Sequence, residues 1–150
     1  MLCQYNSNGT RTSYTYDDAD RITELNNVGI RRYLNVYDKV GNRTRTINTT
    51  IAADITTYTY DQAYQLRSDR THYIGPANTY TYDAVGNRLT FRRTDGSRAT
   101  YTYDAANQLT RILDGGVPST LTYDQAGNAL LHKNTVQPFN ITLTWDAESR

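Results

Sequence analysis

Carboxylates are the most regularly spaced reactive groups in this 150-residue chain. Seven aspartates each follow an aromatic residue directly, in the order Tyr16-Asp17, Tyr37-Asp38, Tyr60-Asp61, Tyr82-Asp83, Tyr103-Asp104, Tyr123-Asp124 and Trp145-Asp146. Two carboxylates held close together can act as general acid and base, or as ligands of a hard metal ion. Successive aspartates here are separated by 21, 23, 22, 21, 20 and 22 residues, which is the register of an internal repeat. Because each repeat supplies a single carboxylate at this position, we expect the aspartates to be structural residues and not members of a catalytic pair.

A tight turn explains why aspartate stands at this position. Its carboxylate can accept a hydrogen bond from the backbone N–H two residues later, which is an Asx-turn. Three of the aspartates are followed three residues later by a glycine, at Gly41, Gly86 and Gly127. Glycine supplies the positive φ that such turns contain. We therefore predict that the seven aspartates and these three glycines form the turns of the repeat.

Other residue types that perform chemistry are sparse. His72 and His132 have no Cys or His neighbour at the spacing of a metal site, and Cys3 has no base beside it. The sequence contains no Gly-rich phosphate loop and no G-x-S-x-G nucleophile motif. It therefore predicts no catalytic residue, no metal ion and no cofactor. A single cysteine permits no internal disulfide and leaves the redox compartment open.

Composition and alternation predict the elements that carry these turns. The chain holds 14 Tyr against 2 Phe and 1 Trp, and both Tyr and Thr favour strands. Runs such as Tyr101-Thr102-Tyr103 alternate with period two, which places Tyr on one face of a strand and Thr on the other. Residues 1–150 are thus predicted to form one all-β array of about seven repeats, the last incomplete. Its expected form is a meander of repeated β-hairpins in a strongly curved, spiralling single sheet of about thirteen or fourteen strands.

Aromatic and leucine side chains are expected to pack on one face of this sheet, namely the seven aromatic residues before the aspartates together with Leu66, Leu89 and Leu109. The distance from an aspartate to the next apolar residue alternates between five residues, as from Asp104 to Leu109, and six, as from Asp83 to Leu89. A slip of one residue would move every apolar side chain to the other face. We therefore expect a shorter turn that sets Tyr103 opposite Leu109 and a longer turn that sets Tyr82 opposite Leu89.

The phrases "YTYDAVGNRLT" and "YTYDAANQLT", which begin at Tyr80 and Tyr101, resemble RHS/YD repeats. The resemblance runs from about Tyr14 to Arg150 and rests on the register of the repeats. It implies a ribbon of hairpins that spirals into a hollow shell, as in bacterial polymorphic toxins, the C component of insecticidal toxin complexes and the teneurins. In the toxins such a shell encloses a C-terminal toxic domain. The self-cleaving aspartates of that family belong to a "DPxGL"-type core segment, which this sequence lacks, so they match no position here.

This resemblance implies a non-enzymatic structural module. It would form part of a toxin-encapsulating shell or assemble head to tail, through open edge strands, into an extracellular filament or larger assembly. The expected partners are further copies of the chain, adjoining RHS repeats or an enclosed toxin domain. The alternative is a cell-surface adhesion module that binds glycans. Both roles predict an extracellular or cell-surface location in a bacterium, although the chain shows no signal peptide.

Charge and hydropathy exclude two further classes of partner. The net charge of +1 gives no general reason to expect nucleic acid, and no apolar run approaches the length of a membrane span. Arg88, Arg92, Arg93 and Arg98 nevertheless cluster around one predicted hairpin. Two interpretations stay open: a solvated outer face with cross-strand Asp and Thr partners, or a small patch for an anionic ligand.

Overall fold

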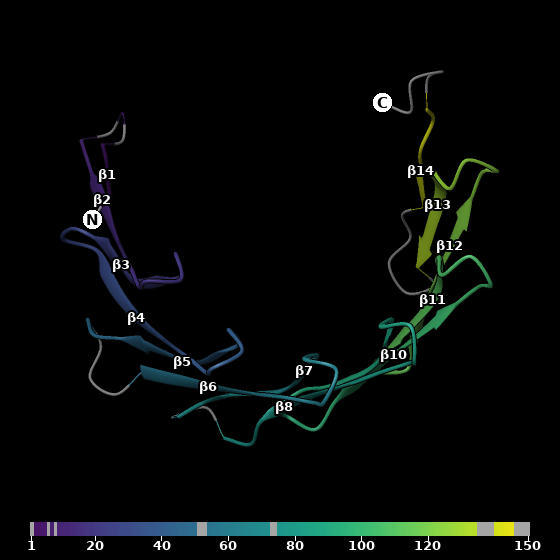
Figure 1. The fold of residues 1–150 in the computed structure, drawn as a ribbon. Helices are drawn as coiled ribbons and strands as arrows, with labels where there is room; N and C mark the ends of the chain where they lie inside the picture. Colours follow the sequence, from purple (N-terminus) through teal and green to yellow (C-terminus); the bar gives the residue numbers. More distant parts are fainter. Residues whose placement is uncertain are drawn as a thin grey trace. The chain divides into compact units, whose positions relative to one another are not determined.

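The computed structural model describes residues 2–5, 7, 9–50, 54–72, 75–134 and 140–145. Every regular element in these ranges is a β-strand. The chain divides into two compact units, Met1–Ala77 and Asn78–Arg150, each of which holds seven strands (Figure 1). Among the described residues no helix could cross a membrane. The predicted all-β meander of hairpins is confirmed.

The first unit contains the strands β1 to β7. Each pairs antiparallel with the next along the chain, without a crossover. Their bounds are β1 Leu2–Tyr5, β2 Arg11–Tyr16, β3 Ile22–Asn27, β4 Arg31–Tyr37, β5 Arg43–Asn48, β6 Asp54–Tyr60 and β7 Leu66–Thr71.

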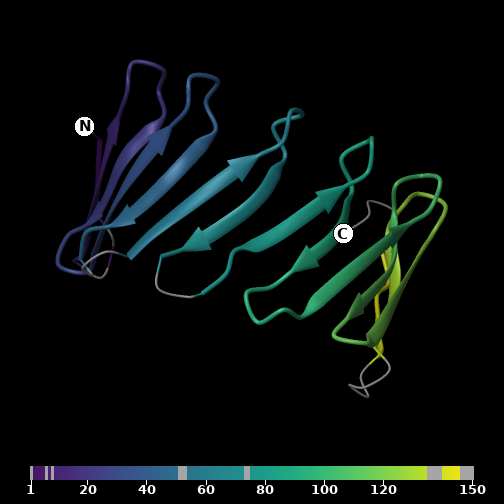
Figure 2. The ribbon, with the colours of Figure 1, turned by 90° about the horizontal axis from the view of Figure 1, so that it is seen from below.

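The second unit repeats this arrangement with strands β8 to β14, and neighbouring hairpins lie side by side within it (Figure 2). Their bounds are β8 Asn78–Tyr82, β9 Arg88–Arg92, β10 Arg98–Tyr103, β11 Leu109–Asp114, β12 Val117–Tyr123, β13 Ala129–Asn134 and β14 Asn140–Thr142. A single array over 1–150 stays a prediction.

All six aspartate turns that the structure describes share one geometry. The aspartate N–H donates to the carbonyl of the residue four positions later, and the N–H three positions later donates back to the aspartate carbonyl. At Asp83 these bonds are 2.9 Å to Asn87 O and 3.2 Å from Gly86 N, and at Asp104 they are 3.0 Å to Gln108 O and 3.1 Å from Asn107 N. The turn therefore has one length in both kinds of repeat.

This uniform turn corrects the predicted register of the longer copies. Tyr103 lies opposite Leu109 as expected, but Tyr82 lies opposite Arg88, so the predicted pairing of Tyr82 with Leu89 is wrong. In each case the ladder shifts by one residue just before the tyrosine, which is a β-bulge. Leu89 is the extra residue of its bulge and remains 38% exposed. The longer spacing in the sequence thus moves the apolar residue into the bulge and leaves the turn unchanged.

A threonine fills the bulge position in three of the six hairpins. The hydroxyl groups of Thr23, Thr44 and Thr110 donate to the backbone carbonyls of Thr15, Val36 and Thr102 across the ladder, at 3.1–3.2 Å. The bulge disrupts the ladder locally and leaves its extra residue unpaired. The threonine hydroxyl supplies a substitute cross-strand bond at that point.

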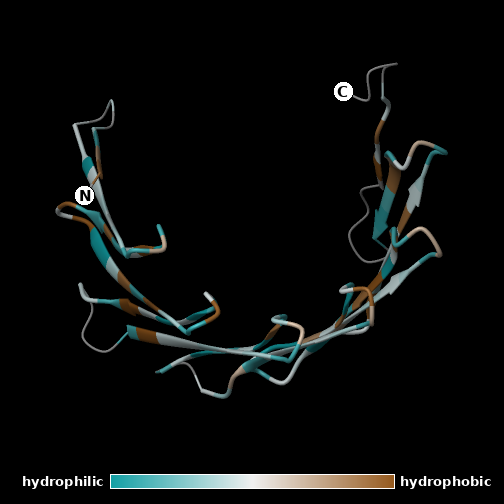
Figure 3. Cartoon of the chain, in the orientation of Figure 1, coloured by the Kyte–Doolittle hydropathy of each residue, from teal (hydrophilic) through white to brown (hydrophobic). Residues whose placement is uncertain are grey.

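The sheet has almost no apolar core. Ala99 is the one buried apolar residue in the described part of the chain, whereas four buried residues are polar: Thr12, Ser13, Asn48 and Ser119. Figure 3 shows apolar and polar residues interspersed along the strands of each unit. Because so little apolar surface is removed from water, backbone ladders and side-chain hydrogen bonds must supply much of the cohesion.

Candidate functional site

The aspartate carboxylate organises each turn. At Asp83, Oδ1 accepts from the backbone N–H groups of Val85 and Asn87 at 3.1 and 2.8 Å, while Oδ2 accepts from the Asn87 side-chain amide at 3.0 Å. The same pair of backbone bonds to Oδ1 forms at each of the other described turns, around Asp17, Asp38, Asp61, Asp104 and Asp124. Asp146 lies outside the described residues. Each carboxylate is thus engaged by its own loop.

Hydrogen bonding to these carboxylates favours their ionised form. The backbone N–H of Arg21 lowers the pKa of Asp17 below its usual value, and the backbone N–H of Asn128 does the same for Asp124. A general acid near neutral pH needs the opposite shift. The turn carboxylates therefore act as fixed hydrogen-bond acceptors.

The fourth residue of each turn adopts a left-handed backbone. In the longer copies it is glycine, with φ of 100°, 96° and 86° at Gly41, Gly86 and Gly127. In the shorter copies it is Asp20, Tyr64 or Asn107, with φ between 58° and 61°. Left-handed backbone disfavours residues other than glycine, least so Asn and Asp. Tyr64 is the residue for which this conformation is least expected.

A repeated hydrogen bond joins four of the aspartate hairpins to the hairpin before them, within one unit. The hydroxyl of Tyr103 donates to the backbone carbonyl of Arg88, on the second strand of the preceding hairpin, at 3.0 Å. We name this contact the tyrosine latch. It recurs from Tyr37 to Ile22, Tyr60 to Arg43 and Tyr123 to Leu109, at 2.8–2.9 Å. Burial raises the pKa of Tyr60 and of Tyr103, which keeps these phenols protonated as donors.

Tryptophan takes the tyrosine's place in the last described copy. The indole Nε1–H of Trp145 donates to the backbone carbonyl of Ala129 at 2.6 Å. Ala129 lies opposite Tyr123, as Leu109 lies opposite Tyr103, so the acceptor occupies the same position of the hairpin. An indole N–H and a phenol O–H both place a donor at the far end of a large ring. The latch thus needs a ring with a terminal donor.

The side of the strands that carries these tyrosines, here named the tyrosine face, also carries arginine side chains stacked on aromatic rings. The guanidinium carbons of Arg21, Arg43 and Arg88 lie over the rings of Tyr37, Tyr58 and Tyr101, at 4.5–5.0 Å from the centroids. The rings of Tyr80 and Phe91 stack at 5.1 Å with an interplanar angle of 2°. These contacts cover apolar rings with flat cationic groups. The result is a surface of stacked guanidinium groups and aromatic rings. None of these contacts pairs a nucleophile with a base.

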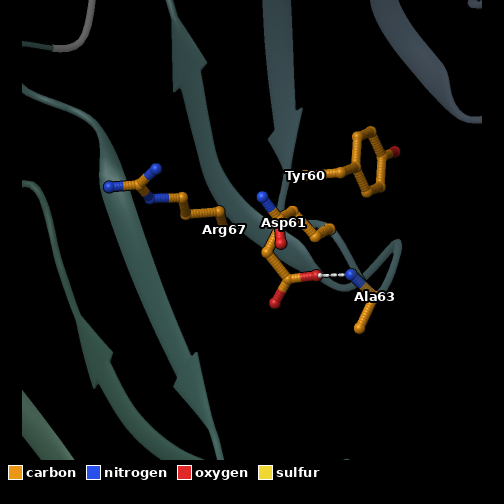
Figure 4. A pocket seen from close by; sticks show the side chains of 5 residues that line it. Tyr60, Asp61, Ala63 and Arg67 are labelled. Atoms are coloured by element: carbon orange, nitrogen blue, oxygen red, sulfur yellow. Dashed lines mark hydrogen bonds between the residues drawn. The ribbon is translucent and has the colours of Figure 1, made fainter.

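An open hollow of about 630 Å³ lies beside the Asp61 turn, lined by Tyr60, Asp61, Gln62, Ala63 and Arg67. The guanidinium of Arg67 and the ring of Tyr60 extend to opposite sides of Asp61 (Figure 4). The Asp61 Oδ1 atom accepts from Ala63 N at 2.9 Å, the bond drawn in the figure. The hollow holds one carboxylate, already engaged by its turn, and its lining residues include no second carboxylate, histidine or cysteine.

The remaining reactive residues are scattered. Cys3 is exposed on β1 with Arg11 Nη2 at 3.2 Å from its sulfur. His72 lines a second hollow, of about 230 Å³, with Ile55, Thr57 and Arg70, whereas His132 lies on β13 opposite Leu121. Among the described residues no three His, Cys, Asp or Glu side chains form a group that could hold a metal ion.

The structure separates the four arginines of the β9–β10 hairpin. Arg88 lies over the Tyr101 ring, and Arg93 forms a two-bond ion pair with Asp114 at 2.7 and 2.6 Å. Arg92 and Arg98 lie directly opposite each other and are both exposed. Sequence reasoning missed the ion pair because Asp114 stands 21 residues beyond Arg93. It also missed the latch, because a backbone carbonyl acceptor leaves no mark in the sequence.

The described hairpins share one turn geometry, and four of them are latched by a tyrosine to the hairpin before. With almost no apolar core among the described residues, this is the arrangement of a repeat protein whose repeats depend on their neighbours. Residues 82–117 match the family model described as RHS Repeat. The resemblance to RHS repeats seen in the sequence is thus confirmed for this segment.

The relatives that this chain matches are much longer proteins, and the chain spans only a small part of each. The tRNA3(Ser)-specific nuclease WapA of Bacillus spizizenii is 37% identical over 81 residues, which are 52% of this chain and 3% of WapA. The structure of TcdB2-TccC3 without its hypervariable C-terminal region has a TM-score of 0.65 at 20% identity, and the match covers 99% of this chain and 9% of that one. The structure of the Photorhabdus luminescens Tc holotoxin pore has a TM-score of 0.60 at 22% identity, and the match covers 94% of this chain and 9% of that one. At these identities the structural likeness shows the fold.

Proposed function

We propose that this chain is a non-catalytic wall segment of a shell that encloses a toxin domain. The observation that carries the proposal is the tyrosine latch, which recurs at a fixed position of the hairpin in both units. Each latch needs a preceding hairpin to supply its acceptor carbonyl, so the unit extends by adding copies. Adding hairpins in this way enlarges the sheet, as the wall of a shell requires. The hairpin contacts described bring no set of reactive groups together.

The relatives supply the context for this wall. One of the matched structures is TcdB2-TccC3 without its hypervariable C-terminal region, and WapA is a tRNA3(Ser)-specific nuclease. In both cases the part similar to this chain is a small fraction of the protein. Catalysis would then belong to a separate domain, while residues 1–150 enclose it. An extracellular destination in a bacterium follows from the same context.

Protection from protease tests this function. The full-length protein is treated with trypsin, and the survival of the toxin domain that the proposal places inside the shell is compared with that of the same domain expressed alone. We expect cleavage inside the shell to be slower by about tenfold or more, because an enclosed chain is cut only when the wall opens. Equal cleavage rates would contradict enclosure.

Edge pairing is a second role that one observation favours. Among the described strands β1 pairs only with β2, and its residues Leu2 and Tyr5 are 61% and 75% exposed. An open strand edge can pair with a strand of another copy, which would give a filament. Light scattering over a concentration series tests this. Growth of large particles that a proline at Gln4 abolishes supports edge assembly, and a monomer at all concentrations contradicts it.

Glycan binding is the alternative outside the structural class. Exposed aromatic rings provide flat surfaces suited to sugar rings, and Tyr64, 62% exposed, is such a ring in the Asp61 turn. Saturable binding on a glycan array that Tyr64→Ala removes would favour adhesion. Absence of binding would leave the wall as the proposed role.

A further inference from the structure

The face opposite the tyrosines carries positive charge in the second unit. Register assigns its members, because Tyr80 opposes Phe91 and Ile112 opposes Tyr101 on the tyrosine face, and neighbouring residues alternate. We name the other side the threonine face. Its charged members in the described strands are Arg92, Arg98, Arg111 and Lys133, and threonines surround them. Within the described strands of this unit, the face holds four cationic residues and no Asp or Glu.

Arg92 and Arg98 form an unusual pair on this face. They lie directly opposite on β9 and β10, the one Arg–Arg pair among the strand registers described within each unit. Like charges directly opposite each other destabilise a sheet. Both side chains are exposed, and neither makes a hydrogen bond or ion pair with another described residue. The fold therefore holds two unneutralised guanidinium groups on adjacent strands.

Nearby carboxylates are committed elsewhere. Asp114 lies opposite Ala99, hence on the tyrosine face, and forms the two-bond ion pair with Arg93. The Asp95 carboxylate accepts from the backbone N–H of Ser97 in the hairpin turn, at 2.8 Å. Neither carboxylate makes an ion pair with Arg92 or Arg98. No described carboxylate neutralises this pair.

We infer that Arg92 and Arg98 bind a phosphate or sulfate group. Directly opposite residues have Cβ atoms about 5 Å apart, so two guanidinium groups can converge on one tetrahedral dianion. Each can donate two parallel hydrogen bonds to such an anion. Thr79 lies opposite Arg92 on the third adjacent strand and is exposed, which adds a hydroxyl donor to the row. A singly charged carboxylate would leave one of the two positive charges unneutralised.

The same face indicates how far a longer ligand would extend. Thr102 lies four residues beyond Arg98 on β10 and opposite Arg111, which is about 13 Å along the strand at 3.3 Å per residue. Lys133 lies in the same row, beyond Thr120. In the described strands of this unit no aromatic residue belongs to the threonine face, so these strands offer no ring there for stacking with nucleobases. A chain of phosphate groups could reach both cationic positions, whereas a single phosphate fits the arginine pair.

Titration with inorganic anions tests this inference, which does not depend on the proposed wall function. The chain, with its arginine side chains observed by ¹⁵N NMR, is titrated with phosphate, sulfate, tripolyphosphate and acetate at constant ionic strength. We expect saturable shifts of the Arg92 and Arg98 Nε–H signals with phosphate and sulfate, and none with acetate. Arg92→Gln and Arg98→Gln should each weaken phosphate binding at least about tenfold, the equivalent of one lost charge-assisted contact. The matched control Arg111→Gln should bind phosphate as the parent does.

The outcomes distinguish a single phosphate group from a polyphosphate chain. A stability measurement shows whether a variant has lost binding because it is misfolded. Tripolyphosphate binding that Arg111→Gln weakens, while phosphate binding is kept, identifies a polymer that spans both positions. If Arg111→Gln binds both phosphate and tripolyphosphate as tightly as the parent does, the ligand is a single phosphate or sulfate group. In anion-free buffer Arg92→Gln should unfold at a higher urea concentration than the parent, because it removes a like-charge contact. No shift in the parent, or equal loss in Arg111→Gln and Arg92→Gln with phosphate, would overturn the inference.

Discussion

The hydroxyl of Tyr103 donates to the main-chain carbonyl of Arg88 at 3.0 Å, from one aspartate hairpin to the hairpin before it. The acceptor carbonyl belongs to the residue that lies opposite Tyr82, directly before the bulge. The hydrogen bond therefore links the turn and bulge of one hairpin to the aromatic ring of the next hairpin, and we call this arrangement a joint. The same joint, with Trp145 as donor to Ala129, closes the described part of the second unit.

Removing the latch hydroxyl should weaken the second unit. Tyr103→Phe keeps the ring and removes the donor, which leaves the carbonyl of Arg88 without this bond. We expect a loss of about 1 kcal/mol in the free energy of unfolding, the usual worth of one hydrogen bond. Tyr101→Phe is the matched control, since the Tyr101 ring lies under Arg88 and no hydrogen bond of its hydroxyl is described. Urea titration followed by circular dichroism would contradict the latch if both variants unfolded alike.

The left-handed turn position should respond oppositely in the two kinds of repeat. Gly41→Ala places a Cβ in a backbone with φ of 100°, where the nearest atom, Arg21 Nη1, is an ordinary 3.9 Å away. Tyr64→Gly relieves the same strain at φ of 61°. The first change should destabilise the first unit by roughly 1–2 kcal/mol and the second should stabilise it by a smaller amount, because glycine also loses entropy on folding. Thermal melting of both variants measures this, and a shift of the same sign in each would contradict the shared turn geometry.

Acid should loosen the turns. The pKa values of Asp17 and Asp124 are lowered, by the backbone N–H groups of Arg21 and Asn128. A lowered folded pKa stabilises the fold above the ordinary Asp value of about 3.9, and that stability is lost as pH falls through the lowered folded value. The urea midpoint should therefore be flat from about pH 7 to 5 and fall between about pH 5 and 2. Asp124→Asn, which keeps an oxygen acceptor without the charge, should reduce the slope, and an unchanged slope would contradict this role of the carboxylate.

The ion pair between Arg93 and Asp114 should contribute little despite its short bonds. Its side chains are 33% and 46% exposed, so water and salt screen the attraction. A double-mutant cycle with Arg93→Gln and Asp114→Asn should give a coupling of about 0.5 kcal/mol at low salt, decreasing at 1 M salt. A coupling above about 2 kcal/mol that resists salt would show that this pair is a main joint of the second unit.

Local features of this fold could be predicted from the sequence. The Asx-turn involves bonds within four residues, so the spacing of Asp83, Gly86 and Asn87 was enough to indicate it. Strand alternation likewise follows from period two. The all-β meander and the position of the described turns could therefore be predicted from the sequence.

Features that depend on the partner strand could not be predicted in this way. The pairing of Tyr82 with Arg88 follows from a bulge, and nothing in the spacing to Leu89 distinguishes a bulge from a longer turn. The latch acceptor is a backbone carbonyl, which every residue has. The Arg92–Arg98 pair was visible as a cluster, but its separation from Arg88 and Arg93 required the register. These are relations between strands, and sequence period alone does not fix them.

The most direct test of the wall account is the structure, by cryo-electron microscopy, of the product of the complete gene. The account predicts that residues 1–150 continue at both ends into further hairpins joined by the same latch, in a wall around a cavity that holds another domain. It would be contradicted by a map in which these residues form a separate body that encloses nothing, with the edge of β1 open to solvent.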